Sequence, residues 1–309
     1  DLVAATALDS KRPPVIAPGM NVVMWAQLAT QANVRVLKER GALFIGPEPG
    51  ELACGVTGLG RMSEPQRILE GSAALLVDRG LMGRKVLVTA GSTQEPWDPV
   101  RFLGNRSTGL MGQAVARAAA ARGAHVTLVA GPCHHPHPGG VEVVSVETAQ
   151  EMSDKVLDLW QDADVVVKAA AVADWRPARS HVVKVEKEGE GETLALEMTR
   201  NPDILETMGR IREERKRTHP VLVGFAAETG EGGLERAREK LARKRCDLLV
   251  LNDVAQRESG FGTPTNRASI LSASSSVEEL ELMSKDRLGH EICKRVEELL
   301  AERSAESST

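Results

Sequence analysis

The chain has 309 residues, and 42% of them are hydrophobic and 27% are charged. This length and composition predict a globular protein with a buried core that is divided into two structural units. The net charge of -4 and the 3% aromatic content, without any Tyr, argue against a nucleic-acid partner, because such a protein needs a positive field and stacking platforms.

Cysteine usage and hydropathy favour a cytoplasmic protein. The four cysteines are far apart and form no CxxC pair, which disfavours a zinc module and a small disulfide scaffold. No apolar run approaches the roughly 20 residues that cross a bilayer, so we predict no membrane partner. Residues 1–8 read as the inside of an ordered segment without an initiator Met. We therefore expect an N-terminally truncated chain.

The first elements along the chain are short. Apolar spacing predicts two strands and two helices, at 14–17, 21–40, 42–45 and 65–79. The stretch 46–61 is rich in Gly and Pro, so we predict a loop there, and 80–84 is the best linker. The predicted units are 1–78 and 79–303, followed by a frayed tail at 304–309.

After the linker the pattern changes to strands that alternate with helices. Buried strands are predicted at 85–89, 124–130, 142–146, 165–169, 221–225 and 248–251, and helices at 109–122, 149–161, 202–217 and 234–245. This alternation predicts an α/β fold with a doubly wound, mostly parallel, Rossmann-like sheet. Ligands of such sheets bind at the carboxyl ends of the strands, which places a site on the loops 90–111, 170–187, 226–233 and 252–266.

The loop after the strand at 85–89 carries small residues that let backbone N–H groups approach an anion. Ser107, Thr108 and Gly109 are predicted to begin a helix whose dipole favours phosphate. The structural alternative is an ordinary strand-to-helix connection. No GxxxxGK[ST] pattern is present, so this is not a Walker loop.

Two further polar segments are candidates for ligand contacts. Asp174, after a strand, is suited to bind a base or ribose, or alternatively to cap a helix. Lys184 and Lys187 flank Glu186 in a predicted solvent-facing hairpin at 184–198 that could swing over a ligand, although charge runs are usually solvated surfaces.

Lys240 and Lys244 are one helical turn apart, so their ammonium groups share a face and repel unless an anion such as triphosphate lies between them. The alternative is a basic helix surface. Asn201-Pro202-Asp203 fits a helix start with Asn201 as the N-cap, which is a purely structural explanation.

A Pro-rich loop at 132–138 contains His134, His135 and His137 next to Cys133. A metal site is conceivable, but no carboxylate at ligand spacing accompanies them. The metal ligands of this chain are therefore unknown from its sequence.

Several motifs occur in an order that resembles phosphopantothenate–cysteine ligase, the second half of the bacterial bifunctional phosphopantothenoylcysteine decarboxylase/ligase. They are 91–93, 98–101, 105–112, 170–175, 201–204 and 224–229. The resemblance implies coenzyme A biosynthesis, with CTP and Mg²⁺, from 4'-phosphopantothenate and cysteine. The acid would first be cytidylylated, and the cysteine amine would then displace CMP.

The resemblance also implies roles for single residues. Asn105 would stabilise the acyl-nucleotide intermediate, Ser107 would bind substrate and Lys184 would contact the nucleotide during activation. The implied nucleotide pocket consists of Lys168, Ala169, Ala170, Asp174, Lys184, Asn201, Pro202, Asp203, Ile204, Phe225, Lys240 and Lys244. Glu186 and Leu110 depart from the family pattern, which has more basic residues there.

Residues 1–78 resemble the C-terminal part of the flavodoxin-like, FMN-dependent decarboxylase half. The motif at 18–25 contains Asn21, which would bind substrate, and 53–62 matches a mobile flap in which Cys54 would donate a proton. The alternative for Cys54 is a free core cysteine. The family's flavin-phosphate loop and catalytic His lie upstream of this motif, so we do not expect decarboxylation by this chain alone.

Two other functions share these features. An NAD(P)-dependent Rossmann-type reductase has the same strand, turn and helix, but the first turn here lacks GxGxxG. A non-catalytic regulatory flavoprotein with a decayed ligase half is the second alternative. The resemblance further implies a homodimer through the ligase half, and a larger oligomer with a complete decarboxylase half. The choice between CTP and ATP is not decided by the sequence.

Overall fold

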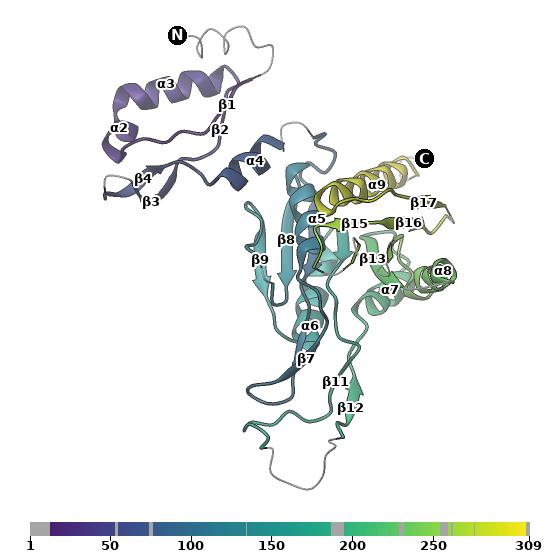
Figure 1. The fold of residues 1–309 in the computed structure, drawn as a ribbon. Helices are drawn as coiled ribbons and strands as arrows, with labels where there is room; N and C mark the ends of the chain where they lie inside the picture. Colours follow the sequence, from purple (N-terminus) through teal and green to yellow (C-terminus); the bar gives the residue numbers. More distant parts are fainter. Residues whose placement is uncertain are drawn as a thin grey trace. The chain divides into compact units, whose positions relative to one another are not determined.

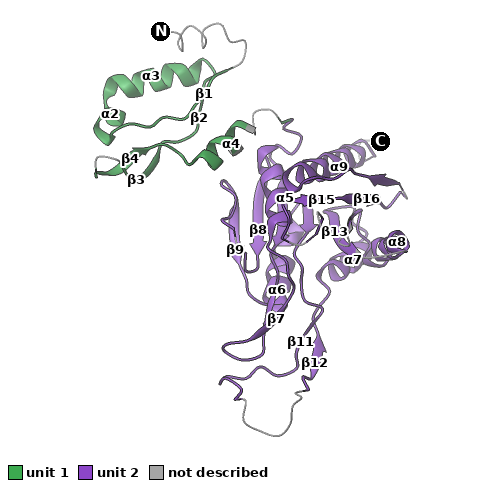
Figure 2. Ribbon diagram, viewed as in Figure 1, with its two compact units in different colours: residues 1–77 green, residues 78–309 purple. Residues whose placement is uncertain are grey.

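The computed structural model describes residues 13–52, 55–73, 77–133, 135–186, 195–228, 232–253, 259–260, 262–274 and 276–306. Two compact units divide the chain at 1–77 and 78–309 (Figure 2). The division falls one residue before the boundary that the sequence predicts. Each unit is described by itself below.

In the first unit, β1 (Val15–Ile16) pairs in parallel with β2 (Leu43–Phe44). The helix predicted over 21–40 is two helices, α2 (Val22–Ala26) and α3 (Leu28–Glu39), because Gln27 takes an extended conformation between them. A further helix, α4 (Pro65–Ala73), follows.

The prediction of a loop over 46–61 is wrong, since this stretch contains an antiparallel hairpin of β3 (Glu48–Glu51) and β4 (Thr57–Arg61). The backbone of β4 packs so closely on segment 20–22 that Gly60 leaves no room for a side chain beside the Met20 carbonyl. Glycine here therefore allows close packing of a strand. A Gly- and Pro-rich composition by itself instead predicts irregular structure.

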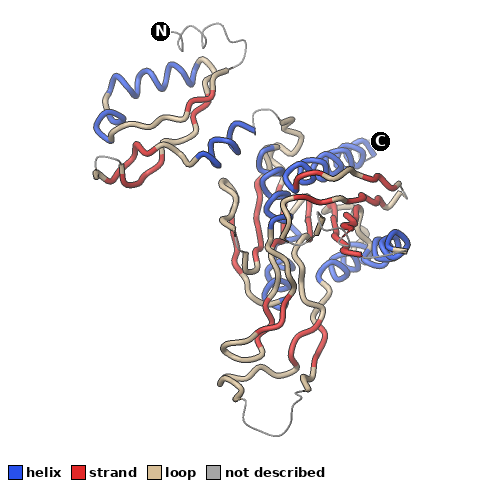
Figure 3. Tube along the Cα trace, in the orientation of Figure 1, coloured by secondary structure: helices blue, strands red, loops and turns tan. Residues whose placement is uncertain are grey.

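The second unit is built on an eight-stranded sheet in the order β17-β16-β14-β13-β10-β5-β8-β9 (Figures 1 and 3). Six adjacent strands of this sheet are parallel to one another: β5 (Lys85–Ala90), β8 (His125–Ala130), β9 (Glu142–Ser145), β10 (Val165–Lys168), β13 (Val221–Glu228) and β14 (Leu248–Asp253). The predicted mostly parallel α/β sheet is thus confirmed.

An antiparallel edge that the sequence analysis does not predict completes this sheet. β16 (Ala268–Ser272) pairs antiparallel with β14, and β17 (Val277–Glu279) pairs antiparallel with β16. Three two-stranded pairs lie outside the sheet: β6 (Gln94–Pro96) with β7 (Phe102–Gly104), β11 (Trp175–Pro177) with β12 (Met198–Arg200), and β15 (Thr265–Asn266) with β18 (Met283–Ser284).

Helices cover both faces of the sheet. α5 (Leu110–Ala121) and α9 (Lys285–Glu306) pack together on one face. α6 (Ala149–Leu159), with the short 3-10 helix Trp160–Asp162, α7 (Ile204–Glu214) and α8 (Gly233–Lys244) cover the other. α9 continues to Glu306 and so includes the first residues of the predicted tail. Among the helices that the structure describes, none is both long and apolar enough to span a membrane.

The two faces enclose separate apolar clusters, because successive side chains of a strand point to opposite sides. In β5, Val86 and Val88 belong to the cluster under α5 and α9, whereas Leu87 belongs to the cluster under α6 to α8. Burial on both faces makes the strands continuous apolar runs, as expected of a parallel sheet. It also holds the carboxyl ends of the strands in fixed positions.

Candidate functional site

The loops after β5 and β10 are joined side by side. The chain continues from β5 to β8 on one side and from β10 to β13 on the other, so the order of the strands reverses between β5 and β10. Thr89 Oγ1 accepts from the Ala170 N–H and Thr93 Oγ1 from the Ala173 N–H, both at 3.0 Å. Ligands of open α/β sheets bind at such a reversal, so these hydrogen bonds frame the candidate site.

Asn105 is attached to this frame by its amide. Its Nδ2 donates to the carbonyl oxygen of Ala171 at 3.0 Å and to that of Val172 at 3.2 Å. Both Nδ2 hydrogens are engaged in this way, which orients the side chain. The oxygen Oδ1 has no partner among the described residues, and it is therefore available as an acceptor.

Helix α5 begins beside Asn105 without a side-chain cap. Its N-cap is Gly109, which has a φ of 83°, and the helix starts at Leu110, one residue after the predicted start. The first N–H groups of an α-helix have no acceptor within the helix, so Leu110 and Met111 present theirs at the edge of the sheet. Gly112 allows this close approach, because a Cβ there would lie 2.6 Å from the Thr89 carbonyl oxygen.

A cavity of about 420 Å³ lies in front of this helix start, and we call it cavity A. All four predicted loops contribute to its lining, together with the neighbouring ends of strands and helices. Of the predicted site residues, cavity A gathers Asn105, Ser107, Lys168, Ala169, Ala170, Asp174, Phe225, Lys240 and Lys244.

A second cavity of about 520 Å³, cavity B, adjoins the first. Lys168, Asp174 and Lys244 line both cavities, so the two share a wall. Four of the remaining residues of the predicted nucleotide pocket line cavity B: Asn201, Pro202, Asp203 and Ile204.

Two structural alternatives for these residues are wrong. Asp203, not Asn201, caps α7 by accepting from the Glu206 N–H at 3.1 Å. Asn201 instead donates from Nδ2 to the Ala173 carbonyl at 2.8 Å. Asp174 is followed directly by strand β11 and not by a helix, so it is not a helix cap. Both side chains are therefore at the cavities for reasons other than helix capping.

The two lysines at the shared wall have different partners: Lys244 pairs with a carboxylate, and Lys168 donates to a backbone carbonyl. Burial opposes the charge of Asp203, but the Lys244 ammonium 3.0 Å away and the Glu206 N–H hold its pKa below the usual value. Lys168 has no carboxylate partner among the described residues, and its Nζ donates to the Ala170 carbonyl at 3.2 Å. Burial and the repulsion from Lys244 lower the pKa of Lys168 to about 8.

Lys184 does not line either cavity, and its side chain is exposed. The segment that carries it is anchored through Val185, whose N–H donates to Asp98 Oδ2 at 3.2 Å and whose carbonyl accepts from Arg101 at 2.8 Å. Lys187 and residues 188–194 of the predicted hairpin lie outside the described residues. The antiparallel pair of β11 and β12 encloses the predicted segment, because β11 ends at Pro177, before it, and β12 begins at Met198, its last residue.

Replacing Asp98 with Asn will loosen this anchor. The Asp98 carboxylate also accepts from the Arg101 guanidinium and from the backbone N–H of Val100, and these donors hold its pKa well below the ordinary value of 3.8. Ionised Asp98 therefore stabilises the folded state fully above about pH 4, and this stabilisation is lost as the pH falls through the pKa of folded Asp98.

We expect the backbone amides of 178–186 to exchange hydrogen faster in Asp98→Asn than in wild type at pH 7, with no change in β8. Unchanged exchange of the Val185 amide would contradict this anchor.

Cavity A also contains residues that the sequence analysis does not identify. Lys285, at the start of α9, is buried, and its Nζ donates to the carbonyl oxygens of Gly260, at 2.9 Å, and Thr263. Burial lowers the pKa of Lys285. Buried Asn266 donates to Asn252 Oδ1 at 3.2 Å. The loop 252–266 is predicted, but no local signal connects it with a lysine at the start of a distant helix.

The remaining candidates lie away from these cavities. Asn21 caps α2 by accepting from the Val23 N–H at 2.8 Å. Cys54 and His134 lie outside the described residues. His135 and His137 are exposed, and the described part of the chain contains no group of three His, Cys, Asp or Glu side chains that could hold a metal ion.

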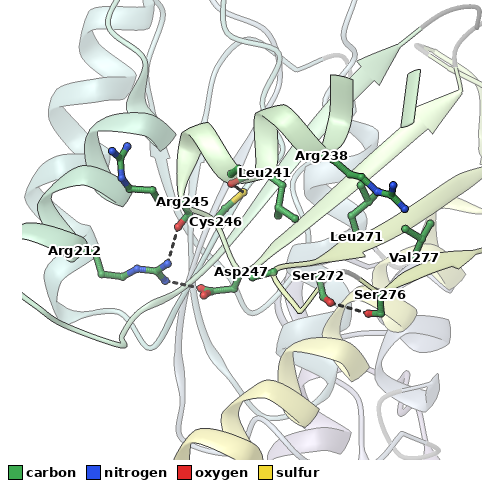
Figure 4. Close-up of a pocket in the computed structure, with 12 residues that line it drawn as sticks. Arg212, Arg238, Leu241, Arg245, Cys246, Asp247, Leu271, Ser272, Ser276 and Val277 are labelled. Atoms are coloured by element: carbon green, nitrogen blue, oxygen red, sulfur yellow. Dashed lines mark hydrogen bonds and ion pairs between the residues drawn. The ribbon is translucent and has the colours of Figure 1, made fainter. Parts of the chain in front are cut away.

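A third cavity, of about 340 Å³, lies at the amino end of β14 and contains none of the predicted site residues (Figure 4). Its lining is apolar at Leu241, Leu271 and Val277, and Arg212 is paired there with Asp247. It is separated from the loops at the carboxyl ends of the strands, where the chemistry-bearing side chains gather. We therefore assign the candidate site to cavities A and B.

Comparisons with known proteins agree with this division of the chain. The model of the Flavoprotein family matches residues 1–77, and that of the DNA/pantothenate metabolism flavoprotein C-terminal domain matches residues 81–300. The coenzyme A biosynthesis bifunctional protein CoaBC of Vibrio vulnificus is 40% identical over 300 residues, which are 97% of this chain and 73% of that protein.

Solved structures resemble the second unit. The crystal structure of the C-terminal domain of a coenzyme A biosynthesis bifunctional protein CoaBC matches with a TM-score of 0.61 and 37% identity, over 73% of this chain and 100% of that chain. A Cab2 mutant in complex with phosphopantothenate-cysteine matches with a TM-score of 0.56 over 76% of this chain and 92% of that chain. Its identity of 17% shows a shared fold alone.

Proposed function

Because the chain belongs to the family of bifunctional CoaBC proteins of coenzyme A biosynthesis, we propose that its second unit joins 4'-phosphopantothenate to cysteine in a reaction driven by CTP. Family membership speaks against the alternative of an NAD(P)-dependent reductase. The relatives' name and the ligand of the Cab2 complex motivate the choice of substrates.

One observation carries this proposal: cavity A combines an amide, a helix start and several ammonium groups at the carboxyl edge of the sheet. Lys240 and Lys244 approach it from α8, and the N–H groups of Leu110 and Met111 approach it from α5. Such donors stabilise phosphate oxygens. The adjoining cavity B supplies room for a base and ribose beside Asp174 and Asn201.

Two chemical steps follow from these groups. In the first, a carboxylate oxygen of 4'-phosphopantothenate attacks the α-phosphorus of CTP, and pyrophosphate leaves. In the second, the cysteine amine attacks the acyl carbon, and CMP leaves as the amide bond forms. Asn105 lines cavity A, and its Oδ1, which has no partner among the described residues, suits a contact to the acyl-nucleotide.

Mg²⁺ would enter this reaction with the triphosphate. The described residues offer Asp174 and Asp203 as carboxylates at the cavities, and Asp203 is already paired with Lys244. A protein site with so few carboxylates suits a Mg²⁺ ion that keeps phosphate and water ligands. The ion would neutralise charge on the leaving pyrophosphate.

The first unit is proposed to belong to the decarboxylase half, in which FMN supplies the redox chemistry when it is bound. Asn21 is oriented by its hydrogen bond to the Val23 N–H, one turn before Trp25, and its amide suits a substrate carboxylate or carbonyl. The ligase reaction proposed for the second unit requires no flavin.

Pyrophosphate release tests the ligase function. We expect the chain to release pyrophosphate from CTP when 4'-phosphopantothenate and Mg²⁺ are present, and to form the amide when cysteine is added. Parallel assays with ATP measure nucleotide preference. If neither nucleotide yields pyrophosphate or amide, the proposed function is wrong.

We further propose that two second units form a dimer through the strand pairs β6–β7 and β11–β12. Phe102 on β7 and Trp175 on β11 are 55% and 46% exposed, and Val182 and Val183 beyond β11 are 94% and 72% exposed. Neighbouring exposed apolar side chains are typical of a protein interface.

Replacing Phe102 and Val182 with Asp should therefore convert the dimer to a monomer. Light scattering coupled to gel filtration measures the mass. The matched control is Leu159→Asp, a change on α6 at a side chain that is 37% exposed, and it should leave the mass unchanged. A dimer that persists in the double variant would place the interface elsewhere.

A further inference from the structure

Lys168 lies at the candidate site but has no role in the two chemical steps proposed above. It ends β10 and lines both cavities. Its Nζ donates to the Ala170 carbonyl, and Nδ2 of Asn105 donates to the next carbonyl, that of Ala171. The lysine and the asparagine thus bind consecutive carbonyl groups of one turn. An acyl group held at Asn105 would be bordered by Lys168.

The charged groups around Lys168 come from three segments. Asp174 follows the same strand, Asp203 precedes α7, and Lys240 and Lys244 lie on α8. Asp203 lies 3.0 Å from Lys244 and forms an ion pair with it. Lys168 instead donates its hydrogen bond to a carbonyl, and burial together with the repulsion from Lys244 outweighs the attraction of Asp203 and Asp174 and lowers its pKa to about 8. A substantial fraction of Lys168 is therefore neutral at slightly alkaline pH.

We propose that Lys168 accepts the proton that the cysteine nitrogen loses during amide formation, an inference that rests on the proposed ligase function. The neutral amine attacks the acyl carbon and forms the C–N bond. The resulting N–H⁺ group transfers its proton to the lone pair of Lys168 Nζ. The C–O bond to phosphate then breaks, and CMP leaves with that electron pair. Lys168 returns the proton to water.

The order of the two steps suits this role. While triphosphate occupies cavity A, its negative charge keeps Lys168 protonated, and the ammonium group can stabilise the phosphates. Once pyrophosphate has left, only the single charge of the α-phosphate remains in the acyl-nucleotide, and Lys244 and burial again favour neutral Lys168. A base is most effective when its pKa lies near the working pH. A carboxylate such as Asp174 is a weaker base for an ammonium proton.

The test isolates the second step by supplying synthetic 4'-phosphopantothenoyl-CMP. Hydroxylamine replaces cysteine in one arm, because it is neutral across the pH range and its own titration does not shape the profile. With the wild-type chain we expect the rate to rise with pH and level off, with a midpoint near 8. In Lys168→Arg, which keeps the charge, and Lys168→Met, we expect a rate about 10²-fold lower and no inflection.

The control is Lys155→Met, a change at an exposed lysine of α6, which should keep the wild-type profile. If Lys168→Arg retains the inflection, or reacts within about threefold of wild type, Lys168 is not the base. Either variant suffices if the other does not fold. A wild-type chain that leaves the acyl-nucleotide unreacted would instead overturn the ligase function itself, so the two failures are distinguishable.

Discussion

Asn105→Ala should release pyrophosphate at a reduced but measurable rate and form amide about 10²- to 10³-fold more slowly, a loss comparable to that of one preorganised polar contact at a reacting centre. The wild-type Nδ2 bridges the carbonyls of Ala171 and Val172, and Oδ1 has no partner in the part of the chain that the structure describes. Alanine removes all of these contacts. The first step depends mainly on the groups that hold the triphosphate, and the second depends on the position of the acyl group.

Single-turnover assays separate the two steps by following pyrophosphate and amide in the same sample. Asn105→Asp is an informative second variant, because it keeps the size of the side chain but cannot donate to the two carbonyls. Gln150→Ala, a change at an exposed amide on α6, is the matched control and should behave as wild type. Normal coupling of pyrophosphate release to amide formation in Asn105→Ala would refute the role of this residue.

Asp247→Ala should lower the free energy of unfolding by about 3–5 kcal/mol, as expected when one partner of a buried ion pair is removed. Asp247 accepts from Arg212 at 2.5 Å, from Arg303 at 2.5 Å and from the Leu222 N–H at 2.7 Å. Figure 4 shows its pairing with Arg212. One carboxylate thus connects α7, α9 and the start of β13.

The alanine variant would leave two guanidinium groups close together and a buried N–H without its acceptor. Urea unfolding at pH 7, followed by circular dichroism, measures the loss. The control is Asp286→Ala, which removes an ion pair with Arg117. The Asp286 side chain is 64% exposed, so this change should lower the free energy of unfolding by only about 0–1 kcal/mol. A loss below about 1 kcal/mol in Asp247→Ala would show that this network does not hold the helices to the sheet.

The parallel part of the sheet was predictable because each of its strands and helices has a hydrophobic pattern that can be recognised within one short segment. Runs such as Val86-Leu87-Val88 are apolar throughout, since both faces of a parallel strand are covered. The helices between them show their periodicity, and the loops that follow the strands all reach one edge. For this reason Asn105, Lys168, Asp174 and Lys240 could be expected at one place, and all four line cavity A.

Other elements were missed because their signals conflict with local rules. The hairpin of β3 and β4 contains Pro49, Gly58 and Gly60, which composition assigns to a loop. The break at Gln27 interrupts a helical pattern without any Gly or Pro. Lys184 is predicted to contact the nucleotide; in the structure it lines neither cavity, and its neighbour Val185 is anchored at Asp98. These outcomes depend on contacts between segments that are far apart in the chain.

The sequence by itself determined the parallel α/β framework, the loops that form the site and the resemblance to a ligase, because hydrophobic periodicity and motif order are properties of short segments. The tertiary structure decided the environment of individual side chains. Lys285 is buried against the carbonyl of Gly260, and among the described residues Lys168 donates to a carbonyl whereas Lys244 pairs with the carboxylate of Asp203. Burial and pairing depend on which distant residues share a volume, and spacing along the chain does not contain that information.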